Sequence, residues 1–207
     1  MFKNLVIAPH VDDEVLGCSS VLGPDTFVYF CGVDETYSYG DSMHRIPLED
    51  RLLEAKEVSE FFGHSFTYIS WSRVNTYNLL EIKDALESMI NEIKPERIFI
   101  HEKGFNQDHN TVYDASMIAL RPHDKNFFVK KVLVYESVHD VTWPPETPEV
   151  NYYIHVNVAK KLMAYSMHAS QVRPYRGPDM ITALARLRGA SAGIDYAEAF
   201  KVLRYVE

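Results

Sequence analysis

Residues 4–14 read NLVIAPHVDDE, a short apolar run that passes directly into one histidine and three carboxylates. The apolar part, Asn4–Pro9, predicts a buried strand. A dinucleotide-binding protein carries a glycine-rich turn at the end of such a strand, with backbone amides facing a pyrophosphate. The acidic residues found here would repel a pyrophosphate and attract a cation. The stretch therefore argues against a dinucleotide site and for a metal site.

Strand-like and helix-like segments alternate four times along the chain. This alternation predicts an α/β fold, a Rossmann-like three-layer sandwich with a mostly parallel sheet. Right-handed crossovers should place the strands at 4–9 and 97–101 side by side at the switch point of the sheet. The other expected strands are 26–32, 66–70 and 131–136, and the expected helices are 14–22, 48–62, 78–93 and 110–120.

The pattern changes after residue 137. A proline-rich segment at 139–150 is followed by an expected strand at 151–156 and by expected helices at 158–167 and 179–188. No linker is long enough to separate two domains, so 1–207 is interpreted as a single domain with a C-terminal α/β elaboration. Residues 33–47 are expected to form a polar loop.

The composition of the chain makes some classes of function less favourable than others. The chain has 207 residues and a formal net charge of −8, which disfavours binding to a nucleic-acid backbone. It has nine histidines and 29 carboxylates but only two cysteines, so a metal site would be built from His and Asp or Glu. No apolar run suits a signal peptide or a membrane span of ~20 residues, so we expect a cytoplasmic protein with buried, unpaired thiols.

Two loops at the expected switch point carry metal-ligand residues. His10 and Asp13 could reach one ion from a single loop, which leaves Asp12 free to face a bound water. A catalytic zinc site needs a third protein ligand, and His109 follows the strand at 97–101, with Asp108 beside it as support for a ligand. In the alternative interpretation, these Asp and Asn residues only cap helices and the histidine lies on the surface.

These loops and several later segments resemble the PIG-L/LmbE family of zinc-dependent N-deacetylases. The first motif is Ala8-Pro9-His10-Val11-Asp12-Asp13-Glu14 and the second is Asn106-Gln107-Asp108-His109. Supporting segments are Arg51, Glu54 and Gly63, then His168-Ala169-Ser170-Gln171, and finally Arg188-Gly189, Gly193 and Ala197-Glu198-Ala199-Phe200. The resemblance thus covers nearly the whole chain and implies the same fold.

The resemblance also implies residue roles. It makes His10, Asp13 and His109 the zinc ligands and Asp12 the general base. Asn106 stands where the family often has a histidine that assists the tetrahedral intermediate. An asparagine can donate a hydrogen bond to an oxyanion but cannot carry a proton to the leaving amine. Asp12 could return the proton that it took, and His168 or His101 are other candidates for the acid.

Two loops are expected to rim the substrate pocket. They are Tyr37–Arg45 and His139–Trp143, whose aromatic residues suit a sugar ring, although they could equally pack on the domain. The expected substrate-binding residues are Arg45, Arg51, Trp143 and His168. Arg51 could instead form a local ion pair with Glu54.

The predicted function is a zinc-dependent hydrolase that removes an acetyl group from an N-acetylated amino sugar or a sugar conjugate. Fe2+ or Mn2+ could replace Zn2+ in a site with two histidines and one aspartate. Two alternatives are metal-dependent hydrolysis of another amide, an ester or a phosphoester, and a non-catalytic sugar-binding protein that has lost its acid at Asn106. The expected partner is a small acetylated sugar, with neither nucleic acid nor a membrane span, and the sequence also allows a homo-oligomer.

Overall fold

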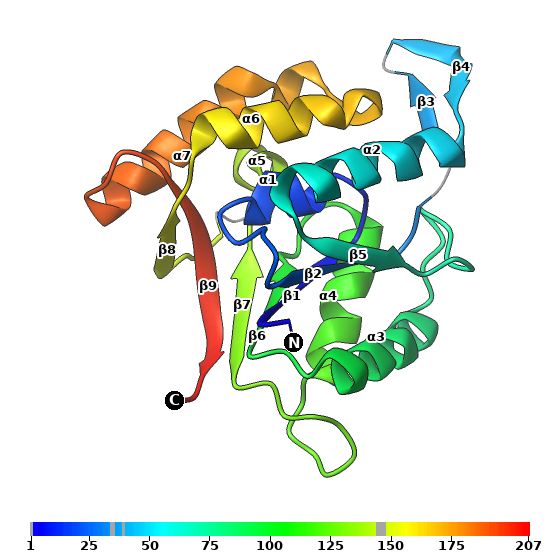
Figure 1. The fold of residues 1–207 in the computed structure, drawn as a ribbon, viewed down its shortest axis with the longest axis vertical. Coiled ribbons are helices and arrows are strands. Elements are labelled where there is room, and N and C mark those ends of the chain that lie inside the picture. The colour runs from blue at the N-terminus through cyan, green and yellow to red at the C-terminus, as the bar shows by residue number, and fades with distance from the viewer. Residues whose placement is uncertain (1, 34–35, 39, 144–147) are drawn as a thin grey trace.

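The computed structural model describes residues 2–33, 36–38, 40–143 and 148–207, and its main feature is one mixed sheet of seven strands (Figure 1). The order across the sheet is β5-β2-β1-β6-β7-β9-β8. The first five strands in this order run parallel, whereas β9 is antiparallel to both of its neighbours. Their bounds are β1 Asn4–Ala8, β2 Thr26–Phe30, β5 Ser65–Tyr68, β6 Arg97–His101, β7 Lys131–Tyr135, β8 Tyr152–His155 and β9 Ala197–Tyr205.

Helices cover both faces of the sheet and complete a three-layer sandwich (Figure 1). On one face, α1 Asp13–Cys18, α2 Leu48–Phe62, α6 Val158–Met167 and α7 Pro178–Ala192 contribute to one apolar cluster, which includes Val15, Val58, Ala164 and Ile181. On the other face, α3 Leu79–Ile93 and α4 Gln107–Ala119 bury Ile82, Leu86, Ile90, Val112 and Ala115 in a second cluster. The expected fold class is confirmed.

The parallel half of the sheet explains where polar loops can gather. Strands β1 and β6 are hydrogen-bonded neighbours, as the crossover rule predicted. All five residues of β1 are buried, because both faces of a central parallel strand are covered by helices. The carboxyl ends of β1, β6 and β7 therefore lie side by side at one edge of the sandwich.

Several expectations about individual elements were wrong. The expected polar loop at 33–47 contains a hairpin of β3 Thr36–Ser38 and β4 Asp41–Ile46, which stands apart from the main sheet (Figure 1). The last strand, β9, was not predicted at all. A short helix, α5 Val138–Thr142, and the 3-10 turns Ala169–Gln171 and Pro174–Arg176 were also missed. Tyr39 and residues 144–147 of the proline-rich segment lie outside the described residues.

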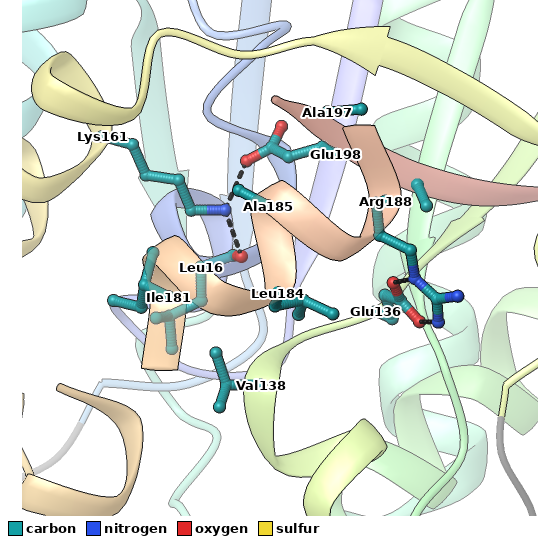
Figure 2. Close-up of a pocket in the computed structure, with 11 residues that line it drawn as sticks. Leu16, Glu136, Val138, Lys161, Ile181, Leu184, Ala185, Arg188, Ala197 and Glu198 are labelled. Carbon is teal, nitrogen blue, oxygen red and sulfur yellow. Dashed lines mark hydrogen bonds and ion pairs between the residues drawn. The ribbon is translucent and has the colours of Figure 1, made fainter. Parts of the chain in front are cut away.

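Two buried ion pairs attach the C-terminal elements to the sheet (Figure 2). Lys161 on α6 donates to Glu198 at 2.6 Å and to the carbonyl of Leu16 at 2.7 Å. Arg188 on α7 donates to both carboxylate oxygens of Glu136, at 2.6 and 2.7 Å. The C-terminal family-like residues Arg188 and Glu198 thus hold α6, α7 and β9 in place, and the cavity between them, about 10 Å³, is too small for a substrate.

The two cysteines, Cys18 and Cys31, are free and buried, as expected. None of the helices in the described part of the chain combines the length and the apolar character that a membrane crossing requires.

Candidate metal and catalytic site

The loop after β1 is held in a strained conformation that separates its two neighbouring aspartates. Asp12 has φ 121°, a left-handed value that costs energy for any residue except glycine. Its backbone N–H donates to Glu14 Oε2 at 2.9 Å, and the N–H of His10 donates to Asp13 Oδ2 at 2.9 Å. Arg51 holds the loop from below by donating to the carbonyl of Val11 at 3.0 Å. Strain of this kind persists where surrounding contacts enforce it, as they do here.

The alternative in which Asp12 only caps α1 does not describe this loop. Asp12 occupies the N-cap position, but its side chain makes no capping hydrogen bond. Its carboxylate instead forms an ion pair with Arg176 at 3.0 Å. Burial raises the pKa of Asp12 above its ordinary value, although the charge of Arg176 opposes this shift. A carboxyl group with a raised pKa is a better proton acceptor than a free aspartate.

Three predicted ligands come together across 99 positions of sequence. His10 Nδ1 lies 3.2 Å from His109 Nε2 and 3.7 Å from Asp13 Oδ2, and the last two atoms are 3.4 Å apart. Ligands that bind zinc tetrahedrally at about 2.0–2.2 Å lie roughly 3.3 Å from one another. Two imidazoles and one carboxylate at this spacing therefore fit a divalent transition metal.

Neighbouring charges act on these ligands in the direction that metal binding requires. Burial alone would raise the pKa of Asp13, but His109, His101 and His10 together lower it well below its ordinary value. Burial, assisted by the charge of His101, lowers the pKa of His109 to about 3. An ionised aspartate and a neutral imidazole are the forms that coordinate a metal.

Asp108 contacts the first of these predicted ligands. His10 Nε2 donates to Asp108 Oδ2 at 2.9 Å, which leaves Nδ1 as the atom directed toward Asp13 and His109. The backbone N–H of Asn75 also donates to Asp108 Oδ2, at 2.6 Å. A carboxylate behind a metal-binding histidine determines its tautomer and ring orientation, so the supporting role expected for Asp108 fits this contact.

The second loop has features of both the helix-capping and the metal-binding interpretation. The side chain of Asn106 caps α4 by accepting hydrogen bonds from the N–H groups of Asp108 and His109, at 2.8 and 3.5 Å. His109 is buried in the ligand group and is not the surface residue of the alternative. The capping contacts engage the amide oxygen of Asn106 and leave its NH2 as the group that could donate to a substrate.

A third loop, which follows β7, was only partly recognised from the sequence. It brings His139 and Asp140 next to His101, the last residue of β6, and together with His109 these residues form a second buried group of possible metal ligands. Asp140 was missed. Its signal was available, because SVHD at 137–140 follows a buried parallel strand, as the other two motifs do.

The four expected substrate-binding residues occupy different environments. Trp143 is 72% exposed at the end of α5, and Arg45 is exposed on β4. Arg51 is buried beneath the loop after β1 and supports it. His168 is completely buried and hydrogen-bonded to Glu14 at 2.7 Å, a contact that raises its pKa against the effect of burial.

An open apolar cavity of about 610 Å³ adjoins the third loop. Its walls include the exposed side chains of Phe105, Trp143, Tyr175 and Met180. His139 belongs both to this cavity and to the second ligand group, so the cavity reaches the polar cluster. Aromatic walls that end at a few convergent polar groups are typical of small-molecule sites.

Comparisons with solved structures confirm the architecture at low sequence identity. N,N'-diacetylchitobiose deacetylase from Pyrococcus horikoshii aligns with a TM-score of 0.78 and 16% identity, over 97% of this chain and 83% of its own. The A40926 pseudoaglycone deacetylase Dbv21 aligns with a TM-score of 0.74 and 19% identity, over 99% and 98%. GalB, a 4-carboxy-2-hydroxymuconate hydratase from Pseudomonas putida KT2440, aligns with a TM-score of 0.73 and 18% identity, over 100% and 99%. One fold thus supports more than one reaction.

A search of curated protein sequences found no match. In contrast, the family model described as GlcNAc-PI de-N-acetylase matches residues 5–120, which is more than half of the chain. The matched range contains both loops that carry His10, Asp13 and His109. The protein therefore belongs to the PIG-L, or GlcNAc-PI de-N-acetylase, family.

Proposed function

We propose that this protein is a metal-dependent hydrolase that removes an acetyl group from an N-acetylated amino sugar or a sugar conjugate. The observation that carries the proposal is the convergence of His10 Nδ1, Asp13 Oδ2 and His109 Nε2 within 3.2–3.7 Å of one another, with the Asp12 carboxylate at the adjoining position. Family membership and the deacetylases among the structural neighbours support this reaction class.

The ligand group fits Zn2+, and Fe2+ or Mn2+ would also suit two imidazoles and a carboxylate. A divalent ion held there would lower the pKa of a bound water and polarise the amide carbonyl. Asp12 would accept the proton of the attacking water. The ion pair with Arg176 would keep its carboxylate ionised and oriented for this task.

The leaving amine must receive a proton, and Asn106 cannot supply one. Asp12 would return the proton that it accepted, acting first as base and then as acid. The amide NH2 of Asn106 would donate a hydrogen bond to the developing oxyanion while its oxygen remains engaged with the helix cap. His10 would be held in its ligand orientation by Asp108 throughout.

The apolar cavity suggests how the substrate would be placed. Trp143, Tyr175 and Phe105 present flat faces that suit a sugar ring or an apolar group attached to it. The acetamide would then extend past His139 toward the metal ligands. Arg45, on the hairpin, would contact a more distant part of the substrate, such as a phosphate.

The proposal is tested by metal content and amine release together. The purified protein would be stripped of metal, reloaded separately with Zn2+, Mn2+ or Fe2+, and incubated with free, nucleotide-linked and lipid-linked N-acetylated amino sugars. The expected result is release of a free amine and acetate in equal amounts, slowed about 10²- to 10⁴-fold in Asp12→Asn.

Two other results would replace the proposal. Stoichiometric metal without amine release from any acetylated sugar would favour the non-catalytic sugar-binding alternative. Hydrolysis of aryl esters or phosphoesters alone would favour the other hydrolase alternative.

A further inference from the structure

Beside the first ligand group lies a second buried group, of which the proposed reaction uses only His109 as a ligand. It consists of His101, His109, His139 and Asp140, whose candidate ligand atoms all lie within 4.8 Å of one another. His109 belongs to both groups. His101 ends β6, His109 lies in the first turn of α4, and His139 and Asp140 lie on α5, so regular elements of the fold hold the group.

The hydrogen bonding of His101 identifies which of its ring nitrogens is a free acceptor. His101 Nδ1 lies 2.7 Å from the carbonyl oxygen of Glu102, which can only accept, so Nδ1 carries the hydrogen. In the neutral ring, Nε2 then bears a lone pair. That atom faces two carboxylate oxygens, Asp140 Oδ2 at 3.6 Å and Asp13 Oδ1 at 3.9 Å. Burial lowers the pKa of His101, but these two carboxylates raise it above its ordinary value, so this place favours a positive charge, which a metal ion would supply in place of a ring proton.

Several buried polar atoms of these residues have no hydrogen-bond partner. Within the described parts of the chain, His101 Nε2, His109 Nδ1 and Asp140 Oδ1 are buried and have no hydrogen-bond partner. Each buried polar atom without a partner costs free energy. His101 and Asp140 both belong to the second ligand group, so a cation bound there would give a partner to each of them.

Ser137 holds the remaining ligands in position. Its N–H and its hydroxyl both donate to Asp140 Oδ2, at 2.7 and 2.8 Å, and leave Oδ1 unengaged. The same hydroxyl oxygen lies 3.0–3.1 Å from the ring nitrogens of His139. Because this hydroxyl donates to Asp140, it accepts from one nitrogen of His139 and leaves the other with a lone pair.

We propose that His101, His139 and Asp140 bind a second divalent transition-metal ion, next to the site of His10, Asp13 and His109. Two imidazoles and one carboxylate suit zinc, iron or manganese and are poor ligands for magnesium or calcium. The shared ring of His109 and the two oxygens of Asp13, one facing each group, place the sites side by side. The loop after β7 supplies the additional carboxylate that such a pair requires.

Zinc stoichiometry tests this site without any assay of activity. The full chain, stripped with a chelator, would be titrated with Zn2+, separated from free metal and analysed by mass spectrometry for zinc per chain. Wild-type protein should bind two ions. His139→Gln and Asp140→Asn should each lower the affinity of one ion at least tenfold in chelator competition, while the other ion is retained.

Two control variants show whether the loss of an ion is specific to the second site. One removes a ligand of the first site, and the other removes an unrelated histidine. His10→Ala should also leave one ion, but the remaining ion should be the one that Asp140→Asn weakens. His155→Gln, at an exposed position on β8, should retain both ions. Far-UV circular dichroism would confirm that each variant is folded, and the conservative Asp140→Asn retains the acceptor that caps α5.

One zinc ion per wild-type chain at saturating Zn2+ would overturn the proposal, as would two ions of unchanged affinity in both His139→Gln and Asp140→Asn. The count is independent of the proposed function. A protein that binds two ions but releases no amine would contradict only the deacetylase proposal, and one that releases amine with a single ion would contradict only the second site.

Discussion

The two ends of the parallel sheet carry similar charged residues in opposite environments. At the amino end, Lys3 pairs with Asp25 at 2.9 Å and Lys131 with Glu96 at 2.7 Å, and the carboxylates of both pairs are exposed to solvent. At the carboxyl end, the carboxylates of Asp12 and Asp13 are buried among arginine and histidine side chains.

Burial, and not the number of charges, thus distinguishes the reactive site from an ordinary charged surface. Water screens the exposed pairs, so their partners hold one another only weakly. At the carboxyl end, desolvation and close charges displace the pKa values of Asp12, Asp13 and His109 in different directions. Changes at this end should therefore alter chemistry, and changes at the amino end should alter little.

The largest effect is expected for Asp12→Asn. The substitution removes the proton acceptor but none of the three ligands, so turnover should fall about 10²- to 10⁴-fold with metal still bound. Steady-state kinetics and metal analysis of the same sample measure both quantities. Near-normal turnover in this variant would exclude Asp12 as the base.

A smaller loss is expected for Asp108→Asn, which weakens the carboxylate contact to His10 Nε2. Metal affinity should fall about 10- to 100-fold, because the ligand ring is no longer held in one tautomer and orientation. Chelator competition measures this affinity. The control is Asp114→Asn on the same helix, where the carboxylate is half-exposed and pairs with Lys103, and it should bind metal as the wild type does.

Arg176→Gln should change the pH dependence of the reaction. The base is active when ionised, so activity falls as the pH decreases through the pKa of Asp12. Burial already raises this pKa and Arg176 opposes the shift, so loss of the cation should raise it further. The acid limb of kcat/KM should move to higher pH, whereas Arg186→Gln, at an exposed ion pair, should leave the limb in place.

Trp143→Ala should weaken substrate binding without affecting the proton transfers. We expect KM to rise about three- to tenfold with kcat nearly constant, because an aromatic wall contacts substrate and transition state alike. Trp71→Ala is the matched control, since Trp71 is also exposed but does not line the apolar cavity. A fall in kcat with unchanged KM would mean that Trp143 does not act as a binding wall.

The smallest effect is expected at the amino end of the sheet. Lys131→Met removes the ion pair with Glu96, which is screened by solvent. Urea unfolding midpoints and kcat/KM should both match those of the wild type. A measurable loss of activity would show that the two ends of the sheet are coupled and would weaken the contrast between them.

Much of the fold could be predicted from the local pattern of apolar residues. The elements that this pattern did not predict were missed for physical reasons. Helix α3 was predicted because its apolar residues recur on one face, and in the structure Asn78 caps its start. Strand β9 was missed because only its first half is fully buried, so AEAFKVLRY lacks a clear pattern. Backbone hydrogen bonds to β7 on one side and β8 on the other stabilise it as a strand. These contacts depend on tertiary packing and cannot be predicted from the side chains of β9.

The residues of the candidate site also fall into those that could be predicted from local sequence and those that could not. Residues 8–14 and 106–109 could be identified because several ligand-type side chains lie close together in each motif. Asp140 was not predicted, because a single aspartate beside a single histidine is common on protein surfaces. Arg176 was not predicted either, because it contacts Asp12 from a turn more than 160 positions away in the sequence.

The types of group available for chemistry follow from the order of residues alone: imidazole and carboxylate without thiolate, placed directly after buried strands. Which of these groups meet depends on how remote segments of the chain pack. Parallel pairing of β1, β6 and β7 brings His10, His109 and Asp140 to one edge, and packing against helices removes the water around them. Distance and desolvation govern ligand binding and proton affinity, and both arise only when remote segments pack together.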